Sequence, residues 1–277
     1  SDAVRSSVGR VEVAVKKEPS TVSHWNLVPA SFAVELSRVS APLGGSDAAR
    51  VNNIRLAAGK LNGLILLPGE SFSFNEVIGP RTVERGYQPA PEIVNQELVE
   101  GVGGGICQVS TTLYNAALLG GMKIQYRRNH SMPLGYVPLG QDATVYYDTI
   151  DLRFRNDLDF PVAIVSGIKD WHVWIALLGK EKPYERVYLE ARDVELIPRP
   201  VRYLDAGGKE LTELPTGAVV AKTVQEGRDG YRVKTYRISQ NGMAKHEELI
   251  SRDYYPPSPK VCLIEYKGGE YETGEGD

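Results

Sequence analysis

The sequence predicts an α+β fold: a catalytic-type domain with two main helices packed on antiparallel strands, followed by a small all-β module. Two segments carry apolar residues at helical spacing, many others alternate with a period of two, and no helical pattern follows residue 183. Because helices and strands are grouped rather than strictly alternating, an α+β class is favoured over a doubly wound parallel sheet.

The pattern divides the chain into four parts. A length of 277 residues suggests two domains, at roughly 100–200 residues per domain. We predict an extended segment over 1–45 that packs on the main domain, the main domain over 46–182, the all-β module over 183–267, and a disordered polar tail over 268–277.

The first elements are two strands and a helix. Residues 11–15 and 32–36 alternate in the manner of half-buried strands. The first helix is predicted over 47–62, with Ser46 as its N-cap and Asp47 in its first turn.

Between the two helices the chain is mostly irregular. Short strands are predicted over 64–67 and through Phe72 and Phe74. The stretch 79–105 is rich in Gly, Pro and Asn, which predicts a long ordered loop. The second helix is predicted over 108–119.

Only strands are predicted after the second helix. In the main domain they cover 122–127, 145–147, 152–154, 162–165 and 171–178, and the last two pair across a turn at 167–170. In the module they are a hairpin of 219–220 with 231–237, a strand over 243–250 after an Asn241-Gly242 turn, and a last strand over 261–266.

Composition excludes several classes of partner. The net charge is −3 and no basic stripe is present, so nucleic acids and anionic membranes are not expected partners. No apolar run approaches the roughly 20 residues that span a bilayer, so a membrane link is expected only through an N-terminal anchor missing from this sequence. Cys107, Cys262 and the four histidines lack zinc-site spacing, and neither a cofactor, a metal nor a disulfide is predicted.

The run Gly103-Gly104-Gly105-Ile106-Cys107-Gln108 is the most informative segment. Three glycines allow unusual backbone dihedrals and close approach of a substrate. A helix that begins at or just after Cys107 presents unpaired N–H groups and a positive dipole end to the thiol, which favours the thiolate. We predict Cys107 as a nucleophile, and Gly103, Gly104, Gly105 and Gln108 as substrate-binding residues whose amides hold an oxyanion.

His130 is the predicted base. A helix of about twelve residues is roughly 18 Å long, and a return strand of six to eight residues rises about 20–27 Å, so His130 can come back beside Cys107. Asp142 is predicted to orient the imidazole, with Asp148, Asp151 and Asn75 as alternatives.

Three neighbours of His130 are also candidates. Asn129, Ser131 and Tyr136 are predicted to bind substrate, although packing in the wall of the site is the simpler interpretation of Tyr136. The simpler alternatives for the two main residues are a buried apolar Cys107 and a His130 that only hydrogen-bonds within its loop.

Five stretches of the main domain resemble the VanW family, named for an accessory protein of vancomycin-resistance clusters. They are ARVNNIRLAAGKLNG (49–63), LPGESFSFNEVIGPRT (67–82), GVGGGICQVSTTLYNAAL (101–118), NHSMPLGYVPLGQDATV (129–145) and LRFRNDLDFPV (152–162). The resemblance implies a cell-envelope role in Gram-positive and related bacteria. Some members resemble a separate class of L,D-transpeptidase, whose proposed nucleophile corresponds to Cys107 and whose base corresponds to His130.

The C-terminal module resembles a G5 domain through residues 214–238, Asn241-Gly242 and residues 256–260. This resemblance implies binding to polymers that contain N-acetylglucosamine, with a plain spacer as the alternative.

Two classes of function remain open. One is a cysteine acyl-transferase that cross-links stem peptides through a thioester, or a cell-wall peptidase or amidase if water resolves that thioester. The other is a non-catalytic protein that binds or scaffolds peptidoglycan. In both, the expected partners are peptidoglycan stem peptides and glycan, and the expected location is the cell envelope or the medium.

Overall fold

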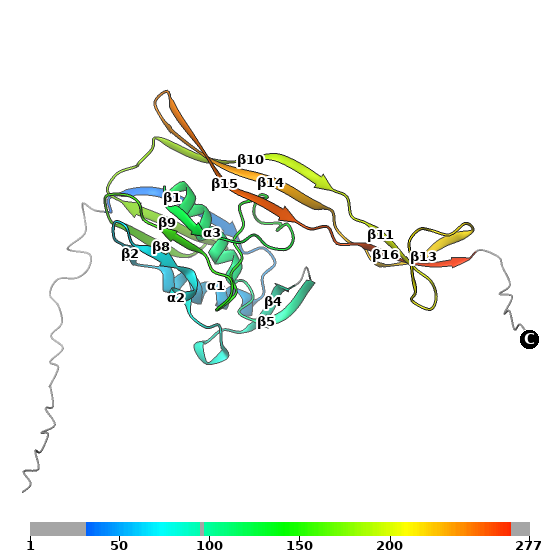
Figure 1. Cartoon of the computed structure of the whole chain (residues 1–277). Helices are drawn as coiled ribbons and strands as arrows, with labels where there is room; N and C mark the ends of the chain where they lie inside the picture. The colour runs from blue at the N-terminus through cyan, green and yellow to red at the C-terminus, as the bar shows by residue number, and fades with distance from the viewer. Residues whose placement is uncertain (1–31, 95–96, 267–277) are drawn as a thin grey trace, which may run out of the picture.

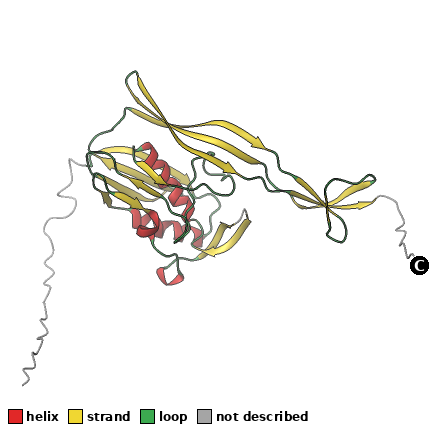
Figure 2. Ribbon diagram, viewed as in Figure 1, coloured by secondary structure: helices red, strands yellow, loops and turns green. Residues whose placement is uncertain are grey.

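The computed structural model describes residues 32–94 and 97–266. They form a rounded body and a long β arm that lies along one side of the body and extends beyond it (Figure 1). The helices are confined to the body (Figure 2). This is an α+β arrangement with an all-β C-terminal part, as predicted. The predicted strand over 11–15 and the predicted tail over 268–277 lie outside the described residues.

A four-stranded antiparallel sheet supports the body, in the order β1-β9-β8-β2. Its strands are β1 (Val34–Pro42), β2 (Leu64–Leu66), β8 (Val162–Lys169) and β9 (His172–Gly179). The predicted β8–β9 hairpin is present, but Lys169 pairs with His172, so its turn is shorter than predicted.

Helices α1 (Ala48–Leu61) and α3 (Ile106–Leu119) pack on this sheet and against each other. Asp47, not Ser46, is the N-cap of α1, because its side chain accepts a hydrogen bond from the Arg50 N–H at 2.7 Å. Helix α3 begins two residues earlier than predicted, which places Cys107 inside its first turn.

The segment between these helices is more regular than predicted. Strand β3 (Ser71–Ser73) ends before Phe74, which starts helix α2 (Phe74–Ile78) because the Ser73 hydroxyl caps the Glu76 N–H. The predicted loop over 79–105 contains a 3-10 turn, Val83–Arg85, and a hairpin of β4 (Pro89–Val94) and β5 (Glu97–Val102). The prolines of β4 made this strand resemble a loop in the sequence. They are tolerated there because β4 pairs with a neighbour on one side only.

A second small sheet has the order β3-β7-β6, with β6 (Lys123–Tyr126) and β7 (Arg153–Arg155). The predicted strand over 145–147 is wrong, since only an isolated bridge joins Tyr146 to Ile150. Asp148, between them, has a φ of 68°, and this left-handed conformation turns the chain back.

The arm consists of two sheets. One has the order β10-β14-β15, and the other β12-β11-β16-β13. The strands are β10 (Arg186–Ile197), β11 (Val201–Leu204), β12 (Glu210–Leu211), β13 (Ala218–Gln225), β14 (Gly230–Asn241), β15 (Ala244–Tyr255) and β16 (Lys260–Tyr266).

The hairpin predicted near Asn241 is present, although Asn241 pairs with Ala244, so the turn residues are Gly242 and Met243. The predicted pairing of 219–220 with 231–237 is wrong, because β13 pairs with β16 instead. Gly227 explains the divergence: its φ is 65° and it packs against the backbone of Pro259, which directs β13 and β14 into different sheets.

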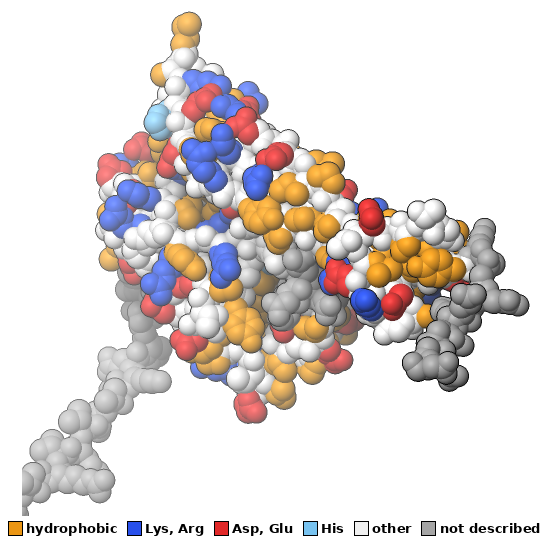
Figure 3. Space-filling model, turned by 45° about the vertical axis from the view of Figure 1, so that its right-hand side comes forward, with side chains coloured by type: hydrophobic (Ala, Val, Ile, Leu, Met, Phe, Trp, Pro, Cys, Tyr) orange, Lys and Arg blue, Asp and Glu red, His pale blue; other side chains and the backbone are white. Residues whose placement is uncertain are grey.

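Acidic and basic side chains are interspersed over the arm on the face shown in Figure 3. Charged side chains of the arm form ion pairs, such as that of Arg192 with Glu190 and Glu247. Among the described residues, no helix is both long and apolar enough to cross a membrane.

Candidate active site

The glycine turn before α3 sets the position of Cys107. Gly103 and Gly105 have φ values of 102° and 101°, which side chains other than hydrogen disfavour. Gly104 is needed for space, since a Cβ there would lie 2.4 Å from the carbonyl oxygen of Ala90 in β4. The three glycines therefore let the turn lie directly on the β4–β5 hairpin as the helix begins.

Cys107 is half-buried as a residue, and its thiol points inward at the start of α3, with Sγ 3.5 Å from the Val145 carbonyl oxygen. Most backbone N–H groups of the turn already donate to nearby carbonyls: those of Gly103, Gly104, Ile106 and Gln108. The N–H groups of Gly105 and Cys107 make no such bond to the described residues. These two amides, rather than the whole turn, are the candidates for holding an oxyanion.

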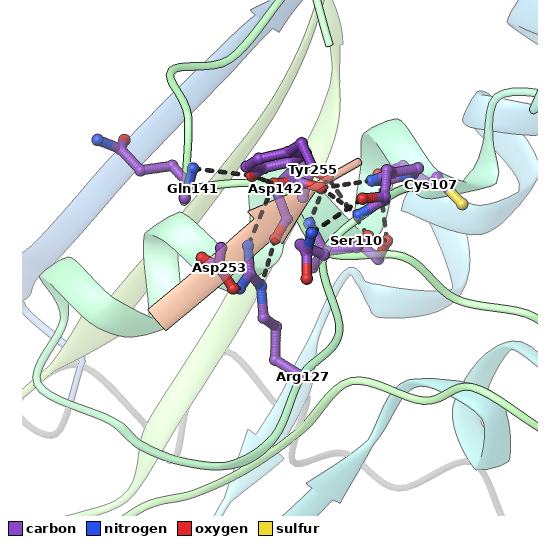
Figure 4. A network of polar contacts seen from close by, with 12 residues as sticks. Cys107, Ser110, Arg127, Gln141, Asp142, Asp253 and Tyr255 are labelled. Atoms are coloured by element: carbon purple, nitrogen blue, oxygen red, sulfur yellow. Dashed lines mark hydrogen bonds and ion pairs between the residues drawn. The ribbon is translucent and has the colours of Figure 1, made fainter. Parts of the chain in front are cut away.

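Asp142 contacts both the ring and the backbone of His130. Its Oδ2 atom lies 2.6 Å from the His130 Nδ1 atom and accepts a hydrogen bond of 2.6 Å from the His130 backbone N–H. Asp142 lies at the centre of a polar network beside the start of α3 (Figure 4). Because Nδ1 faces Asp142, Nε2 is the nitrogen left to exchange a proton with the Cys107 thiol.

The pKa values of the three groups shift in a mutually supporting way. Burial alone raises the pKa of Cys107, but the interaction with the neighbouring His130 ring and its charge outweighs burial, so the thiol pKa is lowered. Burial lowers the pKa of His130, yet the hydrogen bond to Asp142 and the interaction with Cys107 raise it to about 9. Burial raises the pKa of Asp142, and hydrogen bonding to His130 and the charge of Arg127 bring it below its ordinary value. This combination favours a thiolate–imidazolium pair near neutral pH.

Helix α3 also positions the loop that carries Asp142. One turn after Cys107, the Ser110 hydroxyl donates to the Ala143 carbonyl at 2.6 Å. The Thr111 hydroxyl accepts from the Ala143 N–H at 3.0 Å. Cys107 and the loop that carries Asp142 are thus attached to the same rigid element.

The structure distinguishes Asp142 from the alternatives considered for it. Asp148 is exposed. Asp151 accepts hydrogen bonds from Ser73 and Arg153, on the side of β3 and β7. Asn75 donates to the carbonyls of Tyr146 and Ile150 and accepts from Arg81. Among these four candidates, only Asp142 bonds to His130.

Cys107 and His130 line a groove of about 1040 Å³. The predicted substrate-binding residues Gly103, Gly104, Gly105, Gln108, Asn129, Ser131 and Tyr136 also line this groove.

Some of these lining side chains have structural partners. Gln108 accepts from Arg50 and donates to the Pro42 carbonyl. Asn129 donates to the carbonyls of His130 and Tyr254. The ring of Tyr136 is half-buried, and burial raises its pKa. A role as a wall of the groove fits all three.

Sequence reasoning missed Arg127, Asp253 and Tyr255. Arg127 donates to the Asp142 carboxylate and to Asp253, and the Tyr255 hydroxyl donates to Asp142 (Figure 4). The predicted return of the chain toward His130 passes through Arg127, so a buried partner for Asp142 could have been sought there.

The second cysteine and two further histidines, His172 and His246, do not line this groove. Cys262 is buried in β16, and both cysteines are free. His172 and His246 are exposed. Among the described residues, no three Cys, His, Asp or Glu side chains gather in a way that could hold a metal ion.

Comparison with protein families identifies both parts of the chain. The family described as VanW like protein matches residues 49–178, and the family described as G5 domain matches residues 211–264. Two solved structures each match a little under a third of the chain. The crystal structure of HP0197-G5 is 19% identical, covers 28% of this chain and 97% of that chain, and gives a TM-score of 0.17. The IgA1 protease G5 domain structure is 20% identical, covers 30% and 96%, and gives a TM-score of 0.19.

Two curated relatives each match a little under half of this chain. YoaR of Bacillus subtilis (strain 168), named an uncharacterized protein, is 48% identical over 119 residues, which are 43% of this chain and 39% of that protein. The vancomycin B-type resistance protein VanW of Enterococcus faecalis (strain ATCC 700802 / V583) is 36% identical over 139 residues, which are 48% of this chain and 50% of that protein. The chain therefore spans half or less of the length of these relatives.

Proposed function

We propose, since this chain carries a VanW family domain followed by a C-terminal G5 domain, that it is a cell-wall-associated protein of the cell envelope that acts on peptidoglycan. The relative named as a vancomycin resistance protein supports the same setting. More specifically, we propose a cysteine-dependent L,D-transpeptidase that joins stem peptides.

The observation that carries this proposal is the Cys107–His130–Asp142 arrangement. A thiol of lowered pKa lies at a helix start, beside an imidazole of raised pKa that a buried carboxylate orients. This arrangement supports the proposal, because an activated nucleophile needs a base beside it and a third group that orients the base.

The proposed reaction has two steps. The Cys107 thiolate attacks a carbonyl carbon of the donor stem peptide, and the C–N bond breaks as His130 gives its proton to the leaving amine. The amine of a second stem peptide then attacks the thioester carbonyl, the C–S bond breaks, and the proton lost by that amine returns to His130. The amides of Gly105 and Cys107 stabilise the oxyanion formed in each step.

The charge of the groove supports an acidic peptide as donor. Its ionisable lining residues, apart from tyrosines and the Cys107–His130 pair, are Arg50, Arg81, Arg128 and Glu92. Burial raises the pKa of Glu92 and lowers the pKa values of Arg50 and Arg81. Neither of these two arginines forms an ion pair with a described carboxylate. Stem peptides carry free carboxylates, which guanidinium groups bind well.

Intact mass measurement tests the acyl-enzyme. After incubation with a tetrapeptide-bearing muropeptide or a carbapenem, the wild type and Cys262→Ser are expected to gain one acyl group, and Cys107→Ser none. His130→Ala is expected to acylate far more slowly. Absence of an adduct in the wild type, with retention on purified cell wall intact, would replace this proposal with the non-catalytic binding protein.

The fate of the thioester separates the two enzymatic possibilities. With a second stem peptide present, a transpeptidase releases the cross-linked dimer, whereas a peptidase or amidase releases only the hydrolysed donor. Dimer formation that depends on Cys107 supports transfer, and hydrolysis alone contradicts it.

A further inference from the structure

The G5 domain contributes side chains to the network around Asp142. Strand β15, inside the matched range 211–264, ends in Asp253, Tyr254 and Tyr255. The Tyr255 hydroxyl donates to Asp142 Oδ1 at 2.5 Å, and Asp253 Oδ1 accepts from Arg127 Nη1 at 2.5 Å. In Figure 4 these side chains surround Asp142 together with Arg127.

The two modules share the four hydrogen bonds to the Asp142 carboxylate. Oδ2 accepts from the backbone N–H of His130 and faces its Nδ1. Oδ1 accepts from Tyr255 and, at 3.1 Å, from Arg127 Nη2. The orientation of the carboxylate plane, and through it that of the imidazole, therefore depends on a hydroxyl from the other module.

The network is buried, and its charges balance. The side chains of Arg127 and Asp142 are 5% and 2% exposed, and Asp253 and Tyr255 are 7% and 1% exposed. With His130 protonated, two carboxylates face a guanidinium and an imidazolium. The ring of Tyr114 lies 5.1 Å from the Arg127 guanidinium, and burial raises its pKa to about 12, so it adds no charge. In such buried surroundings, the loss of one charge strongly destabilises the charge that was paired with it.

The arm is held closely against this part of the body. The Gly140 N–H donates to the Tyr255 hydroxyl oxygen at 2.9 Å, and a Cβ on Gly140 would lie 2.0 Å from Thr235 Oγ1 in β14. Arg237 of β14 donates to the carbonyls of Leu118 and Met122, at the end of the helix that starts with the nucleophile. The G5 domain thus contacts both the catalytic loop and helix α3.

We propose that the G5 domain is a structural part of the active site and that Tyr255 and Asp253 are positioning residues for His130. Tyr255 acts through Asp142, and Asp253 acts through Arg127. This inference rests on the proposed function for the role of Cys107, and it gives the G5 domain a role beyond attachment to the cell wall.

Thiol reactivity of the full-length chain tests the role of Tyr255. In Tyr255→Phe, the carboxylate of Asp142 loses one of its four fixed donors, so we expect iodoacetamide to alkylate Cys107 about tenfold more slowly at pH 7. The pH profile of alkylation is expected to move toward that of an ordinary thiol. Tyr231→Phe is the matched control, because Tyr231 lies directly opposite Tyr255 in β14 and is expected to leave the profile unchanged. An unchanged profile in Tyr255→Phe would overturn the inference.

A second measurement does not depend on thiol chemistry. In Asp253→Asn, the charge of Arg127 is no longer balanced, so the imidazolium beside it is disfavoured and the pKa of His130 should fall below that of the wild type in an NMR titration. An unchanged His130 titration would overturn the role of Asp253. If Cys107 proves inert in the wild type while Asp253→Asn still lowers the His130 pKa, the cysteine chemistry fails but the coupling between modules stands.

Discussion

Replacing Asp142 by Asn should remove most of the basicity of His130. Its pKa is raised to about 9, against about 6.5 for a free histidine, and this difference corresponds to about 3 kcal/mol of favourable interaction with the charged ring. Without the carboxylate, burial, which lowers the His130 pKa, is opposed mainly by Cys107. We therefore expect the pKa to fall toward the ordinary value of about 6.5, at which about a quarter of the rings are protonated at pH 7. The Cys107 thiol then loses its imidazolium partner, and its pKa should rise toward about 8.5.

Two measurements check this expectation. An NMR titration of His130 reports the fall in its pKa, and the pH dependence of Cys107 alkylation reports the rise in the thiol pKa. Asp151→Asn is the matched control, because Asp151 is also buried and hydrogen-bonded but contacts Ser73 and Arg153 instead of His130. A His130 pKa that stays near 9 in Asp142→Asn, or that falls equally in the control, would refute the reasoning.

Three other expectations follow from the same geometry. Acylation of Cys107 should rise with pH below the ordinary thiol pKa and fall as pH passes about 9, where His130 loses the proton for the leaving amine; a pH–rate profile without the alkaline limb would contradict this. Gly104→Ala should lower the free energy of unfolding by about 1–3 kcal/mol, because its Cβ meets a backbone oxygen, whereas Gly135→Ala, with open space around it, should not; thermal unfolding measures both. Arg81→Gln should weaken the preference for a donor peptide with a free carboxylate over its carboxamide, unlike Arg55→Gln on an exposed face of α1; equal acylation-rate ratios in both variants would count against the anionic-substrate proposal.

The main elements of the body could be predicted because their signals are local. Helix α1 has its apolar residues on one face and an acidic cap, and the β8–β9 hairpin alternates on both sides of a short turn. The start of α3 was predicted to within two residues, because a helix does not continue readily through three glycines. The β4–β5 hairpin was missed because its prolines and glycines resemble a loop when no neighbouring strand is known.

The candidate site shows the same contrast between contacts that are local in the sequence and contacts that are distant. Cys107, His130 and Asp142 lie within 36 positions of one another. The length of the helix and of the strand that returns after it therefore restricted which residues could lie beside Cys107. Tyr255 lies 113 positions from Asp142, and its contact depends on how the arm lies on the body. Local sequence carries no signal for such a contact, and the misassigned partner of β13 shows how little it says about pairing within the arm.

The histidine is carried by a loop, and a loop alone is a poor support for a catalytic group. Here that loop lies between two regular elements: α3 holds the neighbouring residue Ala143 through Ser110 and Thr111, and β15 holds Asp142 through Tyr255. Rigid elements on both sides reduce the rotamers open to Asp142, and a fixed carboxylate keeps the imidazole in one tautomer. The reactivity of Cys107 should therefore depend on how firmly the arm is attached to the body as well as on the three residues themselves. This dependence is the physical reason to treat the two modules as one structural unit around Asp142.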